Sequence, residues 1–213
     1  MKRTIVRHAA IASLALTLSV GLAACGGEDD SNDSAASDST SQTTESSPSE
    51  TASESAADQT FGAGCSAIPT DGAGSFDGMV TEPVANAASA NPLLKTLVAA
   101  VTAADLVDTL NSAPALTVFA PTDDAFAKIP KKDLDAVLAD KPTLTKILTH
   151  HVVEGQLGPD EVVGTHETLA GDKITVKGSG EDYTAENATI VCGNIPTANA
   201  TVYVIDTVMM PKM

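Results

Sequence analysis

The sequence predicts an α+β domain that follows an export signal and a polar tether. Apolar residues recur at helical spacing between residues 83 and 151, whereas short runs rich in β-branched residues follow Gly155. Helices that come first and strands that come later are typical of α+β domains, and not of folds in which the two alternate. The length of 213 residues leaves room for one domain of ordinary size with extensions.

The first two helices are predicted by proline positions and apolar periodicity. Pro83 and Pro92 stand where first-turn prolines belong, and they precede helical runs at residues 84–91 and 93–101. In the second run, helical spacing marks a stripe that faces a core, formed by Leu93, Leu94, Leu97, Val98 and Val101. The apolar surface of residues 93–110 also offers one wall of a pocket between the helices and the strands.

A third helix, a strand and further helices are expected next. Thr102 with Asp105 resembles the capping signature of a helix. Residues 116–120 are expected to form a short apolar strand, after which Asp123 and Asp124 cap a short helix and meet the favourable end of its dipole. The last helical stretches of this half are residues 131–140 and 142–151.

The second half predicts short strands joined by turns. The runs rich in β-branched residues are 167–170, 173–177, 188–192 and 200–210. Gly171-Asp172 and residues 178–180 separate them as turns. With 3% aromatic residues and no tryptophan, the core is expected to be aliphatic.

The charge of the chain disfavours some partners. Its 28 acidic residues outnumber its 12 lysines and arginines, which gives a formal net charge of −16. A surface of this sign repels the phosphates of nucleic acids and anionic lipid headgroups, so we expect no nucleic-acid partner. Contact with a membrane then requires a device other than charge.

Residues 1–24 have the features of a bacterial lipoprotein signal peptide. Lys2, Arg3 and Arg7 precede an apolar run at residues 9–24 that ends in small residues. A transmembrane anchor is the alternative. It is disfavoured because the run is at or below the roughly 17–25 residues that a spanning helix needs.

The signal ends in a motif for lipid attachment. Leu22-Ala23-Ala24-Cys25 matches the bacterial lipobox, in which the cysteine is acylated on sulfur and becomes the mature N-terminus. Acyl chains on Cys25 give stable anchoring, since each buried methylene contributes roughly 0.8 kcal/mol. We therefore expect an exported protein that its lipid holds at the outer face of the bacterial cell membrane.

Residues 25–60 are expected to form the lipidated cysteine and a disordered tether. They contain neither lysine nor arginine, and Ser and Thr alternate with Asp, Glu and Ala. Such a segment cannot bury enough apolar surface to offset its ordering entropy, and its like charges keep it extended. It is suited to a spacer between the membrane and a domain at residues 61–213, and its Ser and Thr residues are candidates for O-glycosylation.

The two remaining cysteines form an even pair in an exported protein. Cys65 stands at the entrance of the domain and Cys192 near its far end, so one disulfide is expected. The closed loop would contribute about 4–5 kcal/mol to stability. A metal site and a catalytic thiol are the alternatives, although two isolated cysteines lack the spacing of a metal site.

Three segments resemble the signature blocks of the fasciclin (FAS1) family. Residues 116–126 (LTVFAPTDDAF) resemble the first block, residues 147–155 (ILTHHVVEG) the middle block, and residues 200–211 (ATVYVIDTVMMP) the last block. The resemblance covers roughly residues 78–211, and it implies a β-wedge of about seven strands flanked by helices. The segments around both cysteines also resemble secreted mycobacterial antigens of this family, and that resemblance implies a disulfide between Cys65 and Cys192.

The middle block contains one departure from the family pattern. His151 matches the histidine of the family, whereas His150 takes the place of a tyrosine. In animal members this neighbourhood is implicated in adhesion, so His150 and His151 mark the expected interaction region. We expect His151 to lie in the core and to bind the first block by a hydrogen bond. Adjacent residues of a strand point to opposite faces, so the two histidines are not expected to share a metal.

The sequence shows no catalytic constellation. It has no glycine-rich phosphate loop, no Gly-x-Ser-x-Gly elbow and no metal-ligand cluster at a recognised spacing. The candidates for catalytic residues are His150, His151, His166 and Asp123. For each of them a structural role is favoured over a catalytic one. We therefore expect no enzymatic activity, no cofactor and no metal.

Three functional hypotheses follow from these features. The leading one is a lipid-anchored surface module that binds a protein on a host surface, in a matrix or in the bacterial envelope. The second is a small-ligand or lipid-binding envelope protein that uses the pocket beside residues 93–110. The third is a hydrolase that uses His151, for which the sequence gives no positive sign.

Overall fold

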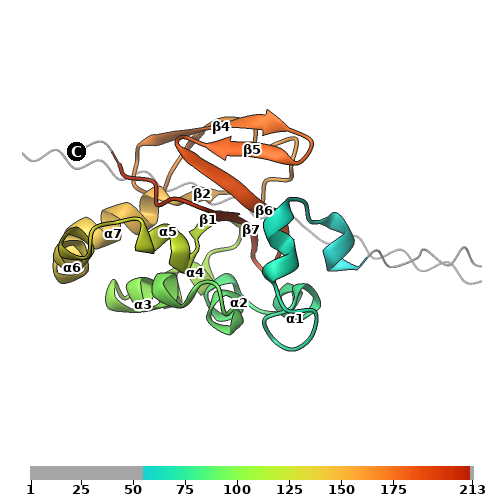
Figure 1. Ribbon diagram of the computed structural model, residues 1–213, viewed down its shortest axis with the longest axis horizontal. Helices are drawn as coiled ribbons and strands as arrows, with labels where there is room; N and C mark the ends of the chain where they lie inside the picture. The colour runs from blue at the N-terminus through green and yellow to red at the C-terminus, as the bar shows by residue number, and fades with distance from the viewer. Residues whose placement is uncertain (1–54, 212–213) are drawn as a thin grey trace, which may run out of the picture. The chain divides into compact units, whose positions relative to one another are not determined.

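In the computed structural model, which describes residues 55–211, seven strands form one mixed sheet (Figure 1). The strands are β1 (Leu116–Pro121), β2 (Val152–Glu154), β3 (Gly164–Glu167), β4 (Lys173–Ser179), β5 (Asp182–Ala185), β6 (Ala188–Pro196) and β7 (Ala200–Ile205). Their order is β2-β1-β7-β6-β5-β4-β3, and only the pair β1–β7 is parallel. A bridge between Val153 and Thr168 brings the two edges of this described sheet together, so that it nearly closes into a barrel.

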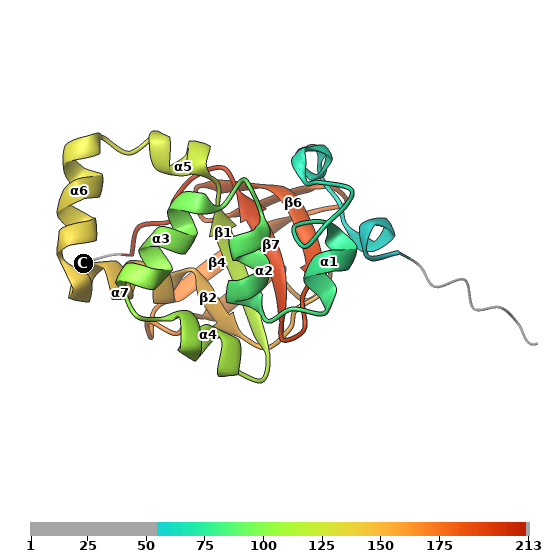
Figure 2. The ribbon, with the colours of Figure 1, turned by 90° about the horizontal axis from the view of Figure 1, so that it is seen from below.

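The helices gather on one side of this sheet. They are α1 (Phe76–Val80), α2 (Val84–Ala90), α3 (Lys95–Ala103), α4 (Val107–Ser112), α5 (Asp123–Ala127), α6 (Lys131–Ala139) and α7 (Lys141–His150). Figure 2 shows α2, α3 and α4 lying across the part of the sheet that contains β1 and β7. The α+β prediction is confirmed. Within residues 55–211, no helix has the length and apolarity that crossing a membrane requires.

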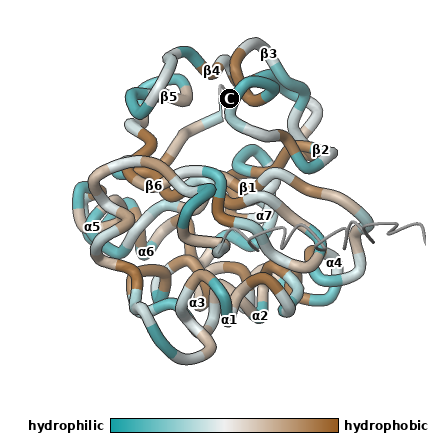
Figure 3. Tube along the Cα trace, turned by 90° about the vertical axis from the view of Figure 1, so that its right-hand side faces the viewer, coloured by the Kyte–Doolittle hydropathy of each residue, from teal (hydrophilic) through white to brown (hydrophobic). Residues whose placement is uncertain are grey.

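Two apolar clusters fill the two sides of the central strands. Along β1, Val118 and Ala120 belong to the cluster beneath the helices, whereas Phe119 belongs to the cluster inside the curved sheet. Along β7, Val204 faces the helices and Tyr203 faces the inside, which is the alternation that a strand produces. In Figure 3 the residues along β1 are coloured as hydrophobic, and hydrophilic residues are frequent around β4 and β5.

At the first signature block, Asp123 and Asp124 lie in the first turn of α5, near the favourable end of its dipole as expected, but neither of them is the residue that caps it. Thr122 caps α5, since its Oγ1 accepts a hydrogen bond of 3.1 Å from the amide of Ala125. Asp123 instead reaches a different helix, where its Oδ1 accepts 2.7 Å from the amide of Thr96 in the first turn of α3. The carboxylate therefore joins the start of α3 to the end of β1.

Two further local predictions were wrong. Thr102 does not begin a helix but lies inside α3, where its hydroxyl donates to the carbonyl of Val98. Asp105 joins α3 to α4 with a φ of 55°, a left-handed conformation that a short polar side chain tolerates. The strand expected at residues 167–170 ends at Glu167, because the amide of Thr168 turns to donate to the carbonyl of Asp172.

An N-terminal arm packs along β6. It contains the 3₁₀ helices η1 (Ala56–Gln59) and η2 (Ala63–Ala67), so ordered structure begins before residue 61, the expected start of the domain. The backbone of Phe61 pairs with that of Gly193, and a Cβ added at Gly193 would lie 2.2 Å from the Phe61 ring. That ring also packs on Tyr183, with centroids 4.8 Å apart. Only hydrogen at position 193 leaves room for this contact.

A disulfide fixes the end of the arm. It joins Cys65 of η2 to Cys192 of β6, with Cα atoms 4.8 Å apart, as the even pair of cysteines predicts. The predicted signal peptide at residues 1–24 and the predicted acylated Cys25 lie outside the described residues, as do residues 26–54 of the expected tether.

Replacing both cysteines (Cys65→Ala with Cys192→Ala) is expected to lower the free energy of unfolding by about 4–5 kcal/mol. The two residues are 127 positions apart, so the bridge restricts most of the unfolded domain. Urea unfolding of the purified protein measures the loss, and reduction of the native disulfide should reproduce it. A midpoint that neither change moves would contradict the prediction.

Candidate functional site

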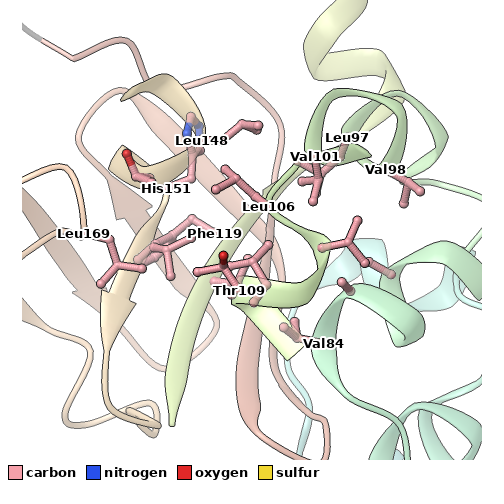
Figure 4. Close-up of a pocket in the computed structure, with 17 residues that line it drawn as sticks. Val84, Leu97, Val98, Val101, Leu106, Thr109, Phe119, Leu148, His151 and Leu169 are labelled. Atoms are coloured by element: carbon pink, nitrogen blue, oxygen red, sulfur yellow. The ribbon is translucent and has the colours of Figure 1, made fainter. Parts of the chain in front are cut away.

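An apolar groove opens between the helices and the sheet, next to the C-terminal end of α7 (Figure 4). Its cavity measures about 60 Å³. The side chains on the helical side come from α2, α3 and α4, and include Val84, Leu97, Val98, Val101 and Leu106. Phe119 of β1 and Leu148 of α7 lie opposite, and the lining is almost wholly apolar.

The groove lies where the sequence places an apolar wall, along residues 93–110. Its volume restricts what fits, since it is well below the roughly 150 Å³ of an engineered apolar cavity that binds benzene. The groove therefore accepts one small apolar side chain or fragment as it stands. An acyl chain would require the helices to separate.

Leu169 forms the solvent side of the groove. Its side chain is 37% exposed, and its amide donates 2.8 Å to the carbonyl of Val152, which fixes the turn after β3. Across the opening, Val98 and Leu106 are half-buried. Residues 55–211 carry 20 acidic side chains and 8 lysines, so this is an apolar patch on an otherwise acidic surface.

His151 lies in the wall of the groove and is 3% exposed. The amide of Met209 donates 2.9 Å to Nε2, so the ring proton stands on Nδ1, which donates 2.8 Å to the carbonyl of Ile147. The pKa of His151 is lowered from 6.5 to about 4, chiefly by burial and also by the nearby His150, and the hydrogen bond to Ile147 opposes both. The imidazole is therefore neutral at pH 7.

The expected link from His151 to the first signature block exists, but not through the side chain. The carbonyl oxygen of His151 accepts 2.8 Å from the amide of Phe119 in β1, whereas the ring binds Met209 in the last block. The middle block thus contacts both other blocks. The histidines also do not lie on a strand, since His150 ends α7 and His151 is its C-cap, with rings perpendicular and 6.1 Å apart.

His150 is buried between two carboxylates. Its Nδ1 lies 2.7 Å from Oδ1 of Asp172, and its Nε2 lies 3.3 Å from Oε2 of Glu186. Burial by itself raises the pKa of Asp172, but hydrogen bonds from Thr168 and His150 outweigh it and leave that pKa below 3.8. The His150 side chain therefore joins the end of α7 to two turns of the sheet, one after β3 and one after β5.

The structure places the expected interaction region beneath the surface. His150 is 2% exposed, whereas the side chains of Asp172 and Glu186 are 32% and 27% exposed. A partner that binds here would contact the two carboxylates before the histidine. The interaction role of His150 and His151 therefore stays a prediction. The contacts of Asp172 and Glu186 with His150 were not predicted from the sequence. A turn residue and an isolated glutamate give no indication of a histidine that is distant along the chain.

The other candidate residues have structural partners. His166 lies on β3 and its Nε2 is 2.8 Å from the carbonyl of Val162, while Asp123 binds the start of α3. Among residues 55–211, no group of three or more His, Cys, Asp or Glu side chains is placed to hold a metal ion.

Residues 92–211 match the family model of the fasciclin domain. The chain belongs to the fasciclin family. It is 48% identical over 160 residues to the cell surface glycolipoprotein MPT83 of Mycobacterium tuberculosis, an alignment that covers 71% of this chain and 72% of that protein. It is 50% identical over 165 residues to the immunogenic protein MPT70 of the same organism, covering 73% and 84% of the two chains.

Less similar proteins match as well. Protein sll1483 of Synechocystis is 39% identical over 133 residues, which cover 61% of this chain and 74% of that protein. Among solved structures, a FAS1 domain pair from the insect cell adhesion molecule Fasciclin I is 22% identical, with a TM-score of 0.47. That match covers 55% of this chain and 45% of the other.

Acidification is expected to destabilise the fasciclin domain between pH 6.5 and 4 through His151. The folded state holds this pKa below its unfolded value, so the stabilisation is fully present above pH 6.5 and is lost as the pH falls toward 4. The loss should be about 3 kcal/mol. Urea unfolding at pH 7, 5.5 and 4.5 measures it.

The matched control is His151→Gln, which cannot titrate in this range. We expect this variant to be less stable at pH 7 but to change less with pH. Protonation of Asp172, whose pKa is also lowered, acts only below this window. Equal pH dependence in the two proteins would contradict the assignment.

Proposed function

We propose that this chain is an exported, lipid-anchored surface protein whose fasciclin domain binds other proteins or components of the envelope. The observation that carries the proposal is the apolar groove with Leu169 at its opening, on a domain with 20 acidic residues and 8 lysines. A small, preformed apolar recess beside an exposed leucine is suited to an anchoring side chain of a partner. The expected partner lies on a host surface, in a matrix or in the bacterial envelope.

The location at the cell surface is supported from two sides. Relatives at 48% identity are named cell surface glycolipoproteins, and residues 1–25 carry the predicted signal and lipobox. An acidic domain gains no electrostatic attraction to anionic lipids, so a covalent lipid on Cys25 supplies the membrane attachment in this proposal. The polar segment after Cys25 then serves as the spacer.

A binding role fits the chemistry of the groove better than an enzymatic one. Both ring nitrogens of His151 are engaged, one with Met209 and one with Ile147, so the ring has no free nitrogen to act as a base. The relatives are named for surface location and immunogenicity, and not for a reaction. A small apolar ligand is a second candidate occupant of the groove, limited by its volume of about 60 Å³.

Leu169→Asp is expected to weaken partner binding by at least about tenfold, because a charge at the opening must be desolvated against apolar walls. Immobilised protein would capture partners from host-surface, matrix and envelope extracts, and the affinity of each captured partner would be measured. Val163→Asp is the matched control, since Val163 is 41% exposed and does not line the groove. Equal loss in both variants, or no captured partner, would count against the proposal.

Cys25→Ser is expected to move the protein from the membrane fraction to the soluble fraction of the cell. A serine cannot accept the thioether lipid, and the rest of the expected mature chain is acidic. Fractionation with detection of the protein measures this shift. Unchanged membrane association of the variant would show that another part of the chain supplies the attachment.

A further inference from the structure

A wider groove, separate from the apolar one, lies between the N-terminal arm and the start of α5. Its cavity measures about 470 Å³, which is within the range of small-ligand and peptide pockets. No residue of its lining belongs to the apolar groove. We refer to it as the arm groove.

The floor of the arm groove is apolar. Ile68 of the arm and Val204 of β7 are buried beneath it, and Leu93 and Val191 are half-buried at its sides. An aliphatic chain laid into the groove would therefore contact apolar surface along its length.

The rim of the arm groove is negatively charged. Asp123, Asp124 and Asp206 contribute three carboxylates, against the single ammonium of Lys128. Lys128 Nζ lies 3.0 Å from Oδ2 of Asp206, and the amide of Thr189 donates 2.8 Å to Oδ1 of the same residue. Two negative charges remain in excess beside the apolar floor.

Two of these three carboxylates are held in place before any partner arrives. Asp123 is fixed by the amide of Thr96, and Asp206 by Thr189 and Lys128. Burial raises the pKa of Asp206, but the hydrogen bonds from Thr189, Lys128 and Thr207 together lower it below 3.8, so the group is ionised at neutral pH. Asp124 is exposed at the rim and is free to reorient.

The wall formed by the arm is equally fixed. The disulfide to Cys192 joins η2 to β6, and a Cβ at Gly64 would lie 2.9 Å from Val191, which shows how closely the arm packs. A preformed wall lowers the entropy that a ligand loses on binding.

We propose that the arm groove binds an extended segment of a partner protein that carries lysine or arginine among aliphatic residues. The stem of the basic side chain packs on Ile68 and Leu93, and its charged end meets Asp124 and the excess charge of the rim. The net charge of −12 on residues 55–211 attracts such a segment from a distance. This contact surface is independent of the apolar groove.

The probe is an acetylated, amidated octapeptide in which arginine alternates with valine, added to the purified protein and followed by amide chemical shifts. The reference peptide carries citrulline in place of each arginine, which keeps the shape and removes the charge. We expect shift changes around Ala67, Asp124, Lys128 and Val191, and about tenfold weaker binding of the reference peptide.

Asp124→Lys is expected to weaken the arginine peptide about tenfold, whereas Asp133→Lys is expected to leave it unchanged. Asp133 is a matched control because it is also an exposed acidic residue in the first turn of a helix, α6. Leu169→Asp should bind the peptide normally, which separates this test from that of the apolar groove.

Four outcomes would overturn the proposal. Shift changes spread evenly over the acidic surface, or equal weakening by both lysine variants, would show general charge attraction. Equal binding of the citrulline peptide would show that the floor alone attracts it. Absence of binding at millimolar peptide and low ionic strength would show that the groove does not accept a basic segment.

Discussion

The parallel pairing of β1 with β7 is the constraint on which the rest of the structure depends. The register joins Leu116 to Ala200 at one end and Pro121 to Ile205 at the other, and every residue of both strands is buried. A parallel pair of this kind requires cover on both faces. The helices packed on one side of the sheet supply one cover, and the curved remainder of the sheet supplies the other. The apolar groove lies beside this pair near the end of α7, and the arm groove lies beside it near the start of α5.

His151 shows how the same constraint limits chemistry. The end of α7 must contact β1 through its backbone and the segment after β7 through its ring, and this leaves the imidazole neutral and fully engaged. A histidine that completes a core in this way cannot also act as a base or a ligand without losing a structural hydrogen bond. The ring therefore forms a fixed part of the wall of the neighbouring groove.

Sequence was sufficient for features that local physics determines. Apolar periodicity located α2, α3, α6 and α7 within a few residues, and the apolar run at residues 116–120 located β1. The β-branched runs located β4, the first part of β6, and β7, which ends at Ile205 and not at residue 210. The signature segments gave the family, and the parity of the cysteines gave the disulfide.

Features that depend on distant partners could not be predicted. The composition around Asp123 indicates a cap, but the helix that it caps follows from how α3 packs beside β1. The short strands β2 and β5 exist only because neighbours of the sheet complete their hydrogen bonds. The carboxylates around His150 come from turns that are 22 and 36 residues away along the chain.

The arm and its disulfide also determine how the domain responds to force. A pull from the N-terminal side first loads the short contacts of η1 and Phe61, and then reaches the covalent bond at Cys65. From there the tension passes directly to Cys192 in β6, an interior strand bonded to β5 and β7. All helices from α1 to α7 lie inside the covalent loop, so this path from the arm to β6 bypasses them. Shear on a protein held at its N-terminal side would therefore act on the arm and β6 before it reaches the helices around the apolar groove.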